Sequence, residues 1–406
     1  MRQTFFLLPL LAGAAPSIGK RQAGMFLPAP GAVEKPVRTT KGEASLYEGA
    51  VRETLLFGPF NVSAADAKHA SVNPIMLKLD PTSDLLCQNC MVLKAQADLA
   101  DRDGKKMDIA SGVYSHHIII TNRGQAMVMP PAMIMCPNGM PGGTNFMDVL
   151  SGGKPKNSSS TAGGHAGHGD MAGIPPSLTK RQGSLLDALI PKVSVFIGQG
   201  DEGTATSFYA KGSAVKTGFF IGTKDTFSML AEVVNYEKKE QEVYVTIDYE
   251  YIPNVPARTK EWLEVGMGAL TVTPCSSQML RPPIDRAERY VSPPWTIMAD
   301  GYLVDMKPHM HDGGVNTTVI LNGKPACTLK AKYGGTDGGA TINGQKWETI
   351  TAYDVCSEPI KVSKGDKITM EAWYDLTAHK LRPMADDHNE SAEGMALASY
   401  LFAKSI

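Results

Sequence analysis

Residues 243–252 read VYVTIDYEYI, in which every odd-numbered position is Val, Ile or Tyr and the even-numbered positions include Thr, Asp and Glu. Side chains of a β-strand point alternately to its two faces, so this alternation predicts a strand with one buried face. Similar runs rich in β-branched residues recur at 113–121, 193–198, 227–235, 316–321, 367–374 and 396–403. Glycine (40 residues) and proline (27 residues) punctuate these runs at a spacing typical of sandwiches. The sequence therefore predicts an all-β protein.

The length of the chain, 406 residues, exceeds what one compact core normally takes. A strand-like run ends in a proline-containing turn at 253–256, which predicts a domain boundary there. We expect two tandem β-sandwich domains, an N-terminal one over 22–253 and a C-terminal one over 254–406. Residues 151–182 are rich in Gly, Ser and Pro and predict a flexible loop within the first domain. Lys180-Arg181 ends this loop, and both a cleaved and an uncleaved loop fit the sequence.

The first residues have the pattern of a secretory signal. Arg2 precedes an apolar run at 5–15 that is too short to span a bilayer, and the dibasic pair Lys20-Arg21 follows. We expect residues 1–21 to be a signal peptide with room for a short propeptide. The mature protein is then expected to be secreted, to the extracellular space or the cell wall, without a transmembrane segment.

The cysteines and the glycosylation sequons also fit a secreted protein. An even number of cysteines favours disulfides over a thiolate zinc site, because only one close pair exists. The six cysteines are Cys87, Cys90, Cys136, Cys275, Cys327 and Cys356. Asn-X-Ser/Thr sequons predict glycosylation at Asn61, Asn157, Asn316 and Asn389.

Charge and composition argue against several classes of function. The net charge is −1 and no cluster of Lys or Arg marks a nucleic-acid surface, so no nucleic-acid partner is expected. A serine hydrolase would need a Gly-X-Ser-X-Gly elbow, which the sequence lacks. A carbohydrate-binding module would draw on the four tryptophans, of which we expect Trp373 to lie in the core.

Two pairs of histidines carry the strongest chemical signal. In His309-Met310-His311, residues two apart share one face of a strand, so both imidazoles can bind one metal ion. His116 and His117 are adjacent in a strand-forming run and should face opposite sides. One ion could take both only at a β-bulge or through the inner ring nitrogens. The alternative is one buried, hydrogen-bonded histidine and one exposed histidine.

Other histidines carry a weaker signal. His165 and His168 stand with Met171 in the glycine-rich loop, which suits either a copper-scavenging tract or, as we favour, a solvated linker. His379 and His388 fall in a polar segment and are expected at the surface. Methionine among imidazoles favours copper over zinc, calcium or magnesium.

The two histidine patterns resemble the copper type II, ascorbate-dependent monooxygenases, whose best-known member is peptidylglycine α-hydroxylating monooxygenase. The resemblance implies two jelly-roll-like β-sandwich domains. It implies one copper on His116, His117 and a later histidine, and a second, catalytic copper on His309, His311 and Met395. An external reductant such as ascorbate would supply electrons, and His116 and His117 would hold the copper that passes them on.

The region 300–403 resembles the stress up-regulated nodulin-type family of plants and fungi more closely. Its recurring elements are found at His309 to Asn316, Cys327, Tyr333-Gly334, Cys356, Gly365-Asp366, Tyr374 and Gly394-Met395. The monooxygenase resemblance implies a Cys90–Cys136 disulfide. We also expect Cys327 to pair with Cys356, which leaves Cys87 and Cys275 for each other.

Two positions depart from the monooxygenase pattern. Asn235 falls where the third histidine of the first copper is expected, and an amide is a poor copper ligand. That copper is then weak, absent, or completed by His69, His165 or His168. Lys307 replaces an arginine that clamps the substrate carboxylate, and the two are not equivalent in bidentate recognition.

Two functions remain open at this point. One is an extracellular copper monooxygenase or related oxidase that acts on an unidentified small molecule or extracellular polymer. The other is a non-catalytic secreted copper-binding or cell-surface stress protein. Fold resemblance does not separate them, because function depends on the site.

Overall fold

The computed structural model describes residues 35–66, 70–79, 86–124, 132–136, 141–142, 194–255, 261–275, 279–334, 339–342, 344–356, 358–383 and 394–405. The expected signal peptide, the expected loop at 151–182 with Lys180-Arg181, and His69, His388, Asn157 and Asn389 lie outside these residues. The described part consists of β-strands and turns with one short 3-10 helix, η2 (Ile109–Ser111). The all-β class with sandwich-like sheets is confirmed. None of the described helices is long and apolar enough to cross a membrane.

The largest sheet has the order β1 (Arg38–Gly42), β2 (Val51–Val62), β12 (Gln241–Ile252), β4 (Cys90–Ala100), β10 (Thr217–Ile221), β13 (Leu263–Thr271), β25 (Gly394–Lys404), β17 (Gly301–Met310) and β23 (Ile360–Val362). Two short strands join it, β14 (Met279–Leu280) beside β25 and β9 (Thr206–Ser207) beside β4.

Two further sheets pack on this one. The first has the order β3 (Ser71–Leu79), β11 (Phe227–Asn235), β5 (Val113–Asn122) and β8 (Ser194–Gln199). The second has the order β22 (Ile350–Tyr353), β19 (Lys324–Tyr333), β18 (Gly314–Leu321), β24 (Lys367–Asp375), β16 (Trp295–Ile297), β6 (Ala132–Met135) and β7 (Pro141–Gly142), with β15 (Ala287–Val291) beside β24. A separate hairpin pairs β20 (Gly339–Ile342) with β21 (Gln345–Glu348).

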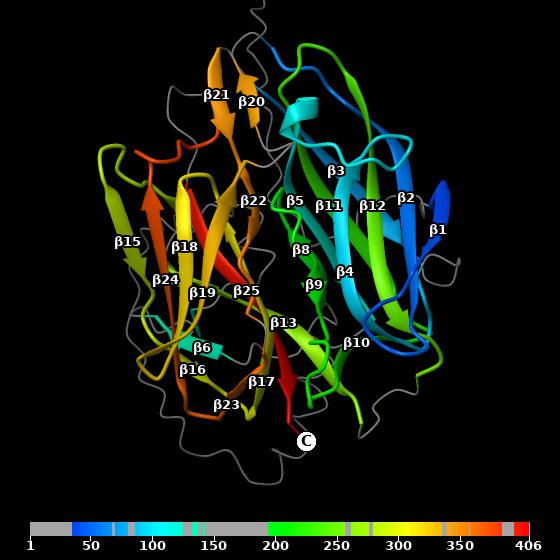
Figure 1. Ribbon diagram of the computed structural model, residues 1–406, viewed down its shortest axis with the longest axis vertical. Coiled ribbons are helices and arrows are strands. Elements are labelled where there is room, and N and C mark those ends of the chain that lie inside the picture. The colour runs from blue at the N-terminus through cyan, green and yellow to red at the C-terminus, as the bar shows by residue number, and fades with distance from the viewer. Residues whose placement is uncertain are drawn as a thin grey trace, which may run out of the picture. The chain divides into compact units, whose positions relative to one another are not determined.

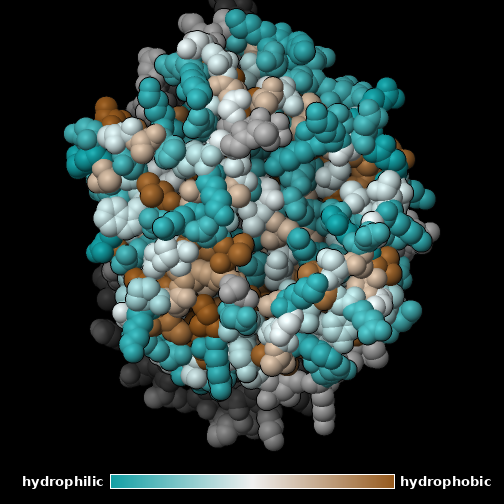
Figure 2. Space-filling view, in the orientation of Figure 1, coloured by the Kyte–Doolittle hydropathy of each residue, from teal (hydrophilic) through white to brown (hydrophobic). Residues whose placement is uncertain are grey.

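The β3-β11-β5-β8 sheet and the sheet that contains β18 and β24 each pack a hydrophobic core against the largest sheet. The β3-β11-β5-β8 sheet contributes Phe196 and Phe227, and the Phe196 ring contacts those of Phe227, Phe208 and Phe219 in one aromatic cluster. The β18-β24 sheet packs a second core, centred on the fully buried Trp295 and Tyr374 side chains, against β17 and β25. Figure 1 shows the β3-β11-β5-β8 sheet beside β2, β12 and β4, and the β18-β24 sheet beside β17 and β25. Polar residues cover most of the face in Figure 2, with hydrophobic residues in scattered patches.

Strands from both sides of residue 253 share the largest sheet. β13 pairs in parallel with β10 and antiparallel with β25. The expected division into domains 22–253 and 254–406 therefore has a sheet running across it, and the division stays a prediction.

The structure pairs the cysteines as Cys87–Cys90, Cys136–Cys275 and Cys327–Cys356. The expectation that all six form disulfides and the pairing of Cys327 with Cys356 are confirmed. The expected pairings Cys90–Cys136 and Cys87–Cys275 are wrong. Cys136 follows β6, which pairs with β16 in the β18-β24 sheet, whereas Cys90 begins β4 and lies in the other core.

The structure also places Trp373 and two of the sequon asparagines. Trp373 on β24 is 38% exposed, so its expected place in the core is wrong. The strand alternates, and its inward positions are taken by Ala372 and Tyr374 instead. The sequon asparagines within the described residues are Asn61, which is exposed on β2, and Asn316, which is half-buried on β18.

Candidate metal centre

A β-bulge places two adjacent histidines on the same side of β5. Across the β5–β11 pair, Glu232 lies opposite His117 and Val233 lies opposite Ser115, so His116 is the extra, bulged residue. The two imidazole ring centroids are 4.0 Å apart with planes inclined at 33°. A regular strand would have sent the rings to opposite faces, so the bulge meets the condition under which one ion could take both.

The second histidine pair comes from β17 and the residue that follows it. His309 is the second-last residue of β17, and the His311 N–H donates to the Met395 carbonyl of β25 at 3.3 Å. The ring centroids of His309 and His311 are 5.6 Å apart. Both rings lie on the side of β17 that faces the histidines of β5. The two-residue spacing predicts that the two rings share a side.

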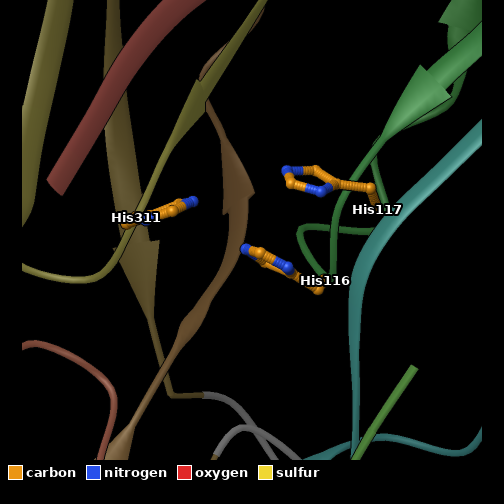
Figure 3. A group of neighbouring side chains, drawn as sticks. All are labelled: His116, His117 and His311. Carbon is orange, nitrogen blue, oxygen red and sulfur yellow. The ribbon is translucent and has the colours of Figure 1, made fainter. Parts of the chain in front are cut away.

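The two pairs meet in one cluster. The His116 and His311 ring centroids are 5.3 Å apart, and those of His117 and His309 are 5.1 Å apart. One ring nitrogen from each of His116, His117 and His311 lies within 4.8 Å of the others. Figure 3 shows these three rings turned toward one another across the space between their strands. Residues nearly 200 positions apart in sequence therefore form a single candidate metal centre.

Two carboxylates, the half-buried Glu232 and the buried Glu202, fix the orientation of three rings. Glu232 Oε2 accepts hydrogen bonds from His116 Nδ1 at 3.0 Å and from His117 Nδ1 at 3.4 Å. Glu202 Oε1 accepts one from His309 Nδ1 at 3.4 Å. With the proton on Nδ1, the lone pair of each ring is on Nε2. The Nε2 atoms of these three histidines are buried and have no hydrogen-bond partner among the described residues.

Such an arrangement fits a metal ion. A buried nitrogen without a partner is costly unless a ligand satisfies it. A histidine that binds a metal normally donates its other ring N–H to a carboxylate or carbonyl, as His116, His117 and His309 do here. The donor set of imidazole nitrogens is one that copper accepts readily.

The electrostatics favour a cation. Burial lowers the pKa of His116 and His117, so both rings are neutral and able to bind a metal. Burial alone would raise the pKa of Glu232, but the hydrogen bonds from the two histidines hold it below its usual range. Burial alone would also raise the pKa of Glu202. The electrostatic interaction and the hydrogen bond with His309 instead lower the pKa of Glu202 to about 2. The cluster therefore combines the neutral imidazoles of His116 and His117 with two carboxylates that stay ionised.

A glycine makes room for the cluster. Gly200 follows β8, and a Cβ atom there would lie 2.8 Å from His309 Cε1 and 2.7 Å from Glu202 Oε2. The Gly200 N–H also donates to Glu202 Oε1 at 3.0 Å. Any larger residue would displace either the ring or the carboxylate that orients it.

Asp312 anchors the turn that follows His311. Its side chain is buried and accepts hydrogen bonds from Trp347 Nε1 at 2.7 Å, Thr349 Oγ1 at 3.0 Å and the Ile350 N–H at 3.0 Å. These contacts join the end of β17 to the segment around β21 and β22, and so fix the position of the His311 backbone. Asp312 falls inside the recurring element at His309 to Asn316, but the sequence analysis gave it no role. Glu202, Glu232 and Gly200 were missed, since no local pattern separates them from other Glu or Gly residues.

Met395, a predicted ligand, and Asn235, at the position where a third histidine is expected, have other contacts in the structure. The Met395 side chain is 2% exposed and packs in an apolar cluster with Ile119, Val195 and Leu397. Its carbonyl contacts His311, so it lies next to the centre, and its role as a sulfur ligand stays a prediction.

The Asn235 side chain is hydrogen-bonded to the turn that follows β11 and to Ser63. It donates to the Ser63 and Lys239 carbonyls at 3.0 and 2.9 Å, and accepts from Glu237 N–H and Gln241 Nε2. Within β11 the residue that reaches the histidines is Glu232, three positions earlier.

A cavity of about 230 Å³ lies beside β17, the strand that carries His309. Its lining includes Tyr209, Asp305, Lys307 and Tyr353. Lys307 is buried and donates to Thr206 Oγ1 at 3.2 Å, and burial lowers its pKa. His379, expected at the surface, is half-buried and stacks on Tyr333 at 3.5 Å.

Comparison with known proteins gives distant relatives. No protein-family model matches the chain. A protein of Phoma sp. (strain ATCC 20986 / MF5453) is 22% identical over 329 residues, which cover 80% of this chain and 67% of that protein. A protein of Cochliobolus lunatus is 26% identical over 207 residues, which cover 50% of this chain and 63% of that protein. Both are described as probable copper-dependent oxygenases.

The chain is distantly related to these proteins. Their description agrees with the histidine cluster, whose imidazole nitrogens are ligands that copper accepts. The chain spans about two thirds of the first relative and less of the second, so the activity of either whole protein is not carried over here.

Proposed function

We propose that this chain is a secreted copper-dependent oxygenase with its copper at the cluster of His116, His117 and His311. The observation that carries the proposal is the convergence of three imidazole nitrogens within 4.8 Å, from strands far apart in sequence. The two relatives described as copper-dependent oxygenases support copper as the metal. Three disulfides are consistent with an oxidising, extracellular compartment.

The protein's own residues prepare the centre for a redox metal. Glu232 holds two rings with their Nε2 atoms free, and Glu202 does the same for His309. Copper bound there would supply the one-electron chemistry with dioxygen that an oxygenase needs, with ascorbate or another external reductant as the electron source.

The number of copper ions depends on whether the four histidines bind one ion or are shared between two. A single copper would take His116, His117 and His311 and leave His309 beside it. Two coppers would follow the division implied by the monooxygenase resemblance, with His116 and His117 on one ion and His309, His311 and Met395 on the other. The 5.1 Å between the His117 and His309 ring centroids makes any two ions close neighbours.

The cavity beside β17 is the proposed place for a substrate. Its volume of about 230 Å³ suits a small organic molecule, and Asp305 and Lys307 provide charge in its lining. A single lysine ammonium does not offer the bidentate recognition of an arginine, so a peptidylglycine substrate is not proposed.

Copper titration followed by electron spin resonance tests the proposal. We compare the parent protein with His116→Ala, His311→Ala and the control His379→Ala, whose ring stacks on Tyr333. A single centre predicts that both cluster variants lose the same bound ion and the same spectrum, while the control keeps them. Loss of a different ion from each variant would show two centres, and unchanged copper binding in both would refute the site.

Oxygen consumption separates an oxygenase from a protein that only binds copper. The copper-loaded parent should consume oxygen in the presence of ascorbate, and His311→Ala should not. Copper binding without any such consumption would favour a non-catalytic copper-binding protein.

A further inference from the structure

We propose that Asn316 carries an N-linked glycan and that Trp373 is the surface against which its first N-acetylglucosamine packs. The inference rests on the proposed secretory route and not on copper chemistry. Asn316-Thr317-Thr318 forms a sequon in β18, and Trp373 lies in the neighbouring strand β24.

Strand register brings the two side chains together. β18 and β24 are antiparallel, and Asn316 lies directly opposite Trp373. Directly opposed residues project from the same face of a sheet, with Cβ atoms about 4.5–5.5 Å apart. Their neighbours Thr317 and Tyr374 are buried, so Asn316 and Trp373 both face outward.

The side chain of Trp373 is partly open to solvent. It is 38% exposed, and no aromatic or cation–π contact to it is found in the described part of the chain. Its other cross-strand neighbour, Arg289, pairs with Glu371 at 3.6 Å. Lys330 follows Asn316 in the same row, on β19. A large apolar ring thus stands alone in a row of polar side chains, where a pyranose ring can cover it with its C–H face and leave its hydroxyls in water.

The Asn316 side chain is available for the attachment. It is half-buried, and the described residues give its amide no hydrogen bond or ion pair to break. In the modification, a bond forms between Asn316 Nδ2 and the anomeric carbon of an oligosaccharide. The bond from that carbon to a lipid pyrophosphate donor breaks, and the pyrophosphate leaves with the amide proton.

Asn61 provides a matched contrast within the same chain. It is an exposed sequon residue on β2, but its cross-strand neighbour is Glu242 on β12. A glycan on Asn61 has no indole to cover there. Packing against a ring should therefore be specific to the Asn316 glycan.

The test uses the full chain produced in a glycosylating secretory host. Mass spectrometry of glycopeptides reports occupancy of Asn316. Thermal unfolding is then measured for the parent, Trp373→Ala, Asn316→Gln and the double variant. We expect Trp373→Ala to lower the unfolding midpoint by about 2 °C more in the glycosylated parent than in the Asn316→Gln background.

Two further arms sharpen the test. Trimming with an endoglycosidase that leaves one N-acetylglucosamine should keep the difference, since only the first sugar touches the ring. Trp373→Tyr should retain most of the glycan-dependent stability that Trp373→Ala removes. Asn61→Gln should leave the effect of Trp373→Ala on the unfolding midpoint unchanged.

The proposal is overturned if Asn316 is unoccupied, or if Trp373→Ala shifts the midpoint equally with and without the Asn316 glycan. Copper titration of the same variants keeps the two proposals apart. Unchanged copper binding with a failed glycan test would leave the copper centre standing.

Discussion

Glu232 lies directly opposite His117 across the β5–β11 pair, and its Oε2 atom accepts hydrogen bonds from both His117 and the bulged His116. One carboxylate therefore orients two imidazoles that a regular strand would have separated. The bulge supplies the position of the rings and Glu232 supplies their tautomer.

Glu232→Gln should weaken copper binding about 10- to 100-fold, because the amide keeps the shape but loses the charge that holds two Nδ1 protons. Copper titration with a competing chelator measures the change. Glu240→Gln, an exposed residue in the turn after β11, is the control and should bind copper as the parent does. Equal affinities for all three proteins would contradict a role for Glu232.

Gly200→Ala should disturb the same centre from another side. The new Cβ would lie 2.8 Å from His309 Cε1, which forces the ring or Glu202 to move and costs about 1–3 kcal/mol of stability. Denaturant unfolding and copper titration should both report a loss. Gly339→Ala is the control, since a Cβ there meets only the Trp347 carbonyl oxygen at 3.9 Å.

Met395→Leu tests whether the sulfur is a ligand. The swap nearly conserves volume, so the free energy of unfolding should change by less than about 1.5 kcal/mol. If Met395 binds copper, X-ray absorption of the reduced, copper-loaded protein should lose its sulfur scattering. Met306→Leu, also buried, should keep it. A parent spectrum with nitrogen scattering alone would leave Met395 as a packing residue.

The disulfides should differ in their contribution to stability. Cys136–Cys275 joins residues 139 positions apart, and Cys87–Cys90 joins residues only 3 apart. Chain entropy in the unfolded state predicts losses of about 5 and about 2 kcal/mol when each pair is replaced by alanine. Denaturant unfolding of the two double variants measures both values. A larger loss for Cys87–Cys90 would contradict the entropic account.

The pattern of the sequence determined the strands and the metal-binding residue types. The alternation in 243–252 predicts β12, and the spacing of His309 and His311 predicts two rings on one face. These are local properties, because strand side chains repeat every two residues whatever the strand packs against.

Tertiary structure alone decided how these elements meet. The bulge at His116, the opposition of Glu232 and the approach of β17 to β5 depend on register between strands far apart in the chain. The disulfide partners of Cys90 and Cys136, and the exposed side of β24 that carries Trp373, depend on which sheet covers which face. No local period encodes such long-range pairing, since its free energy comes from burying two sheets against each other.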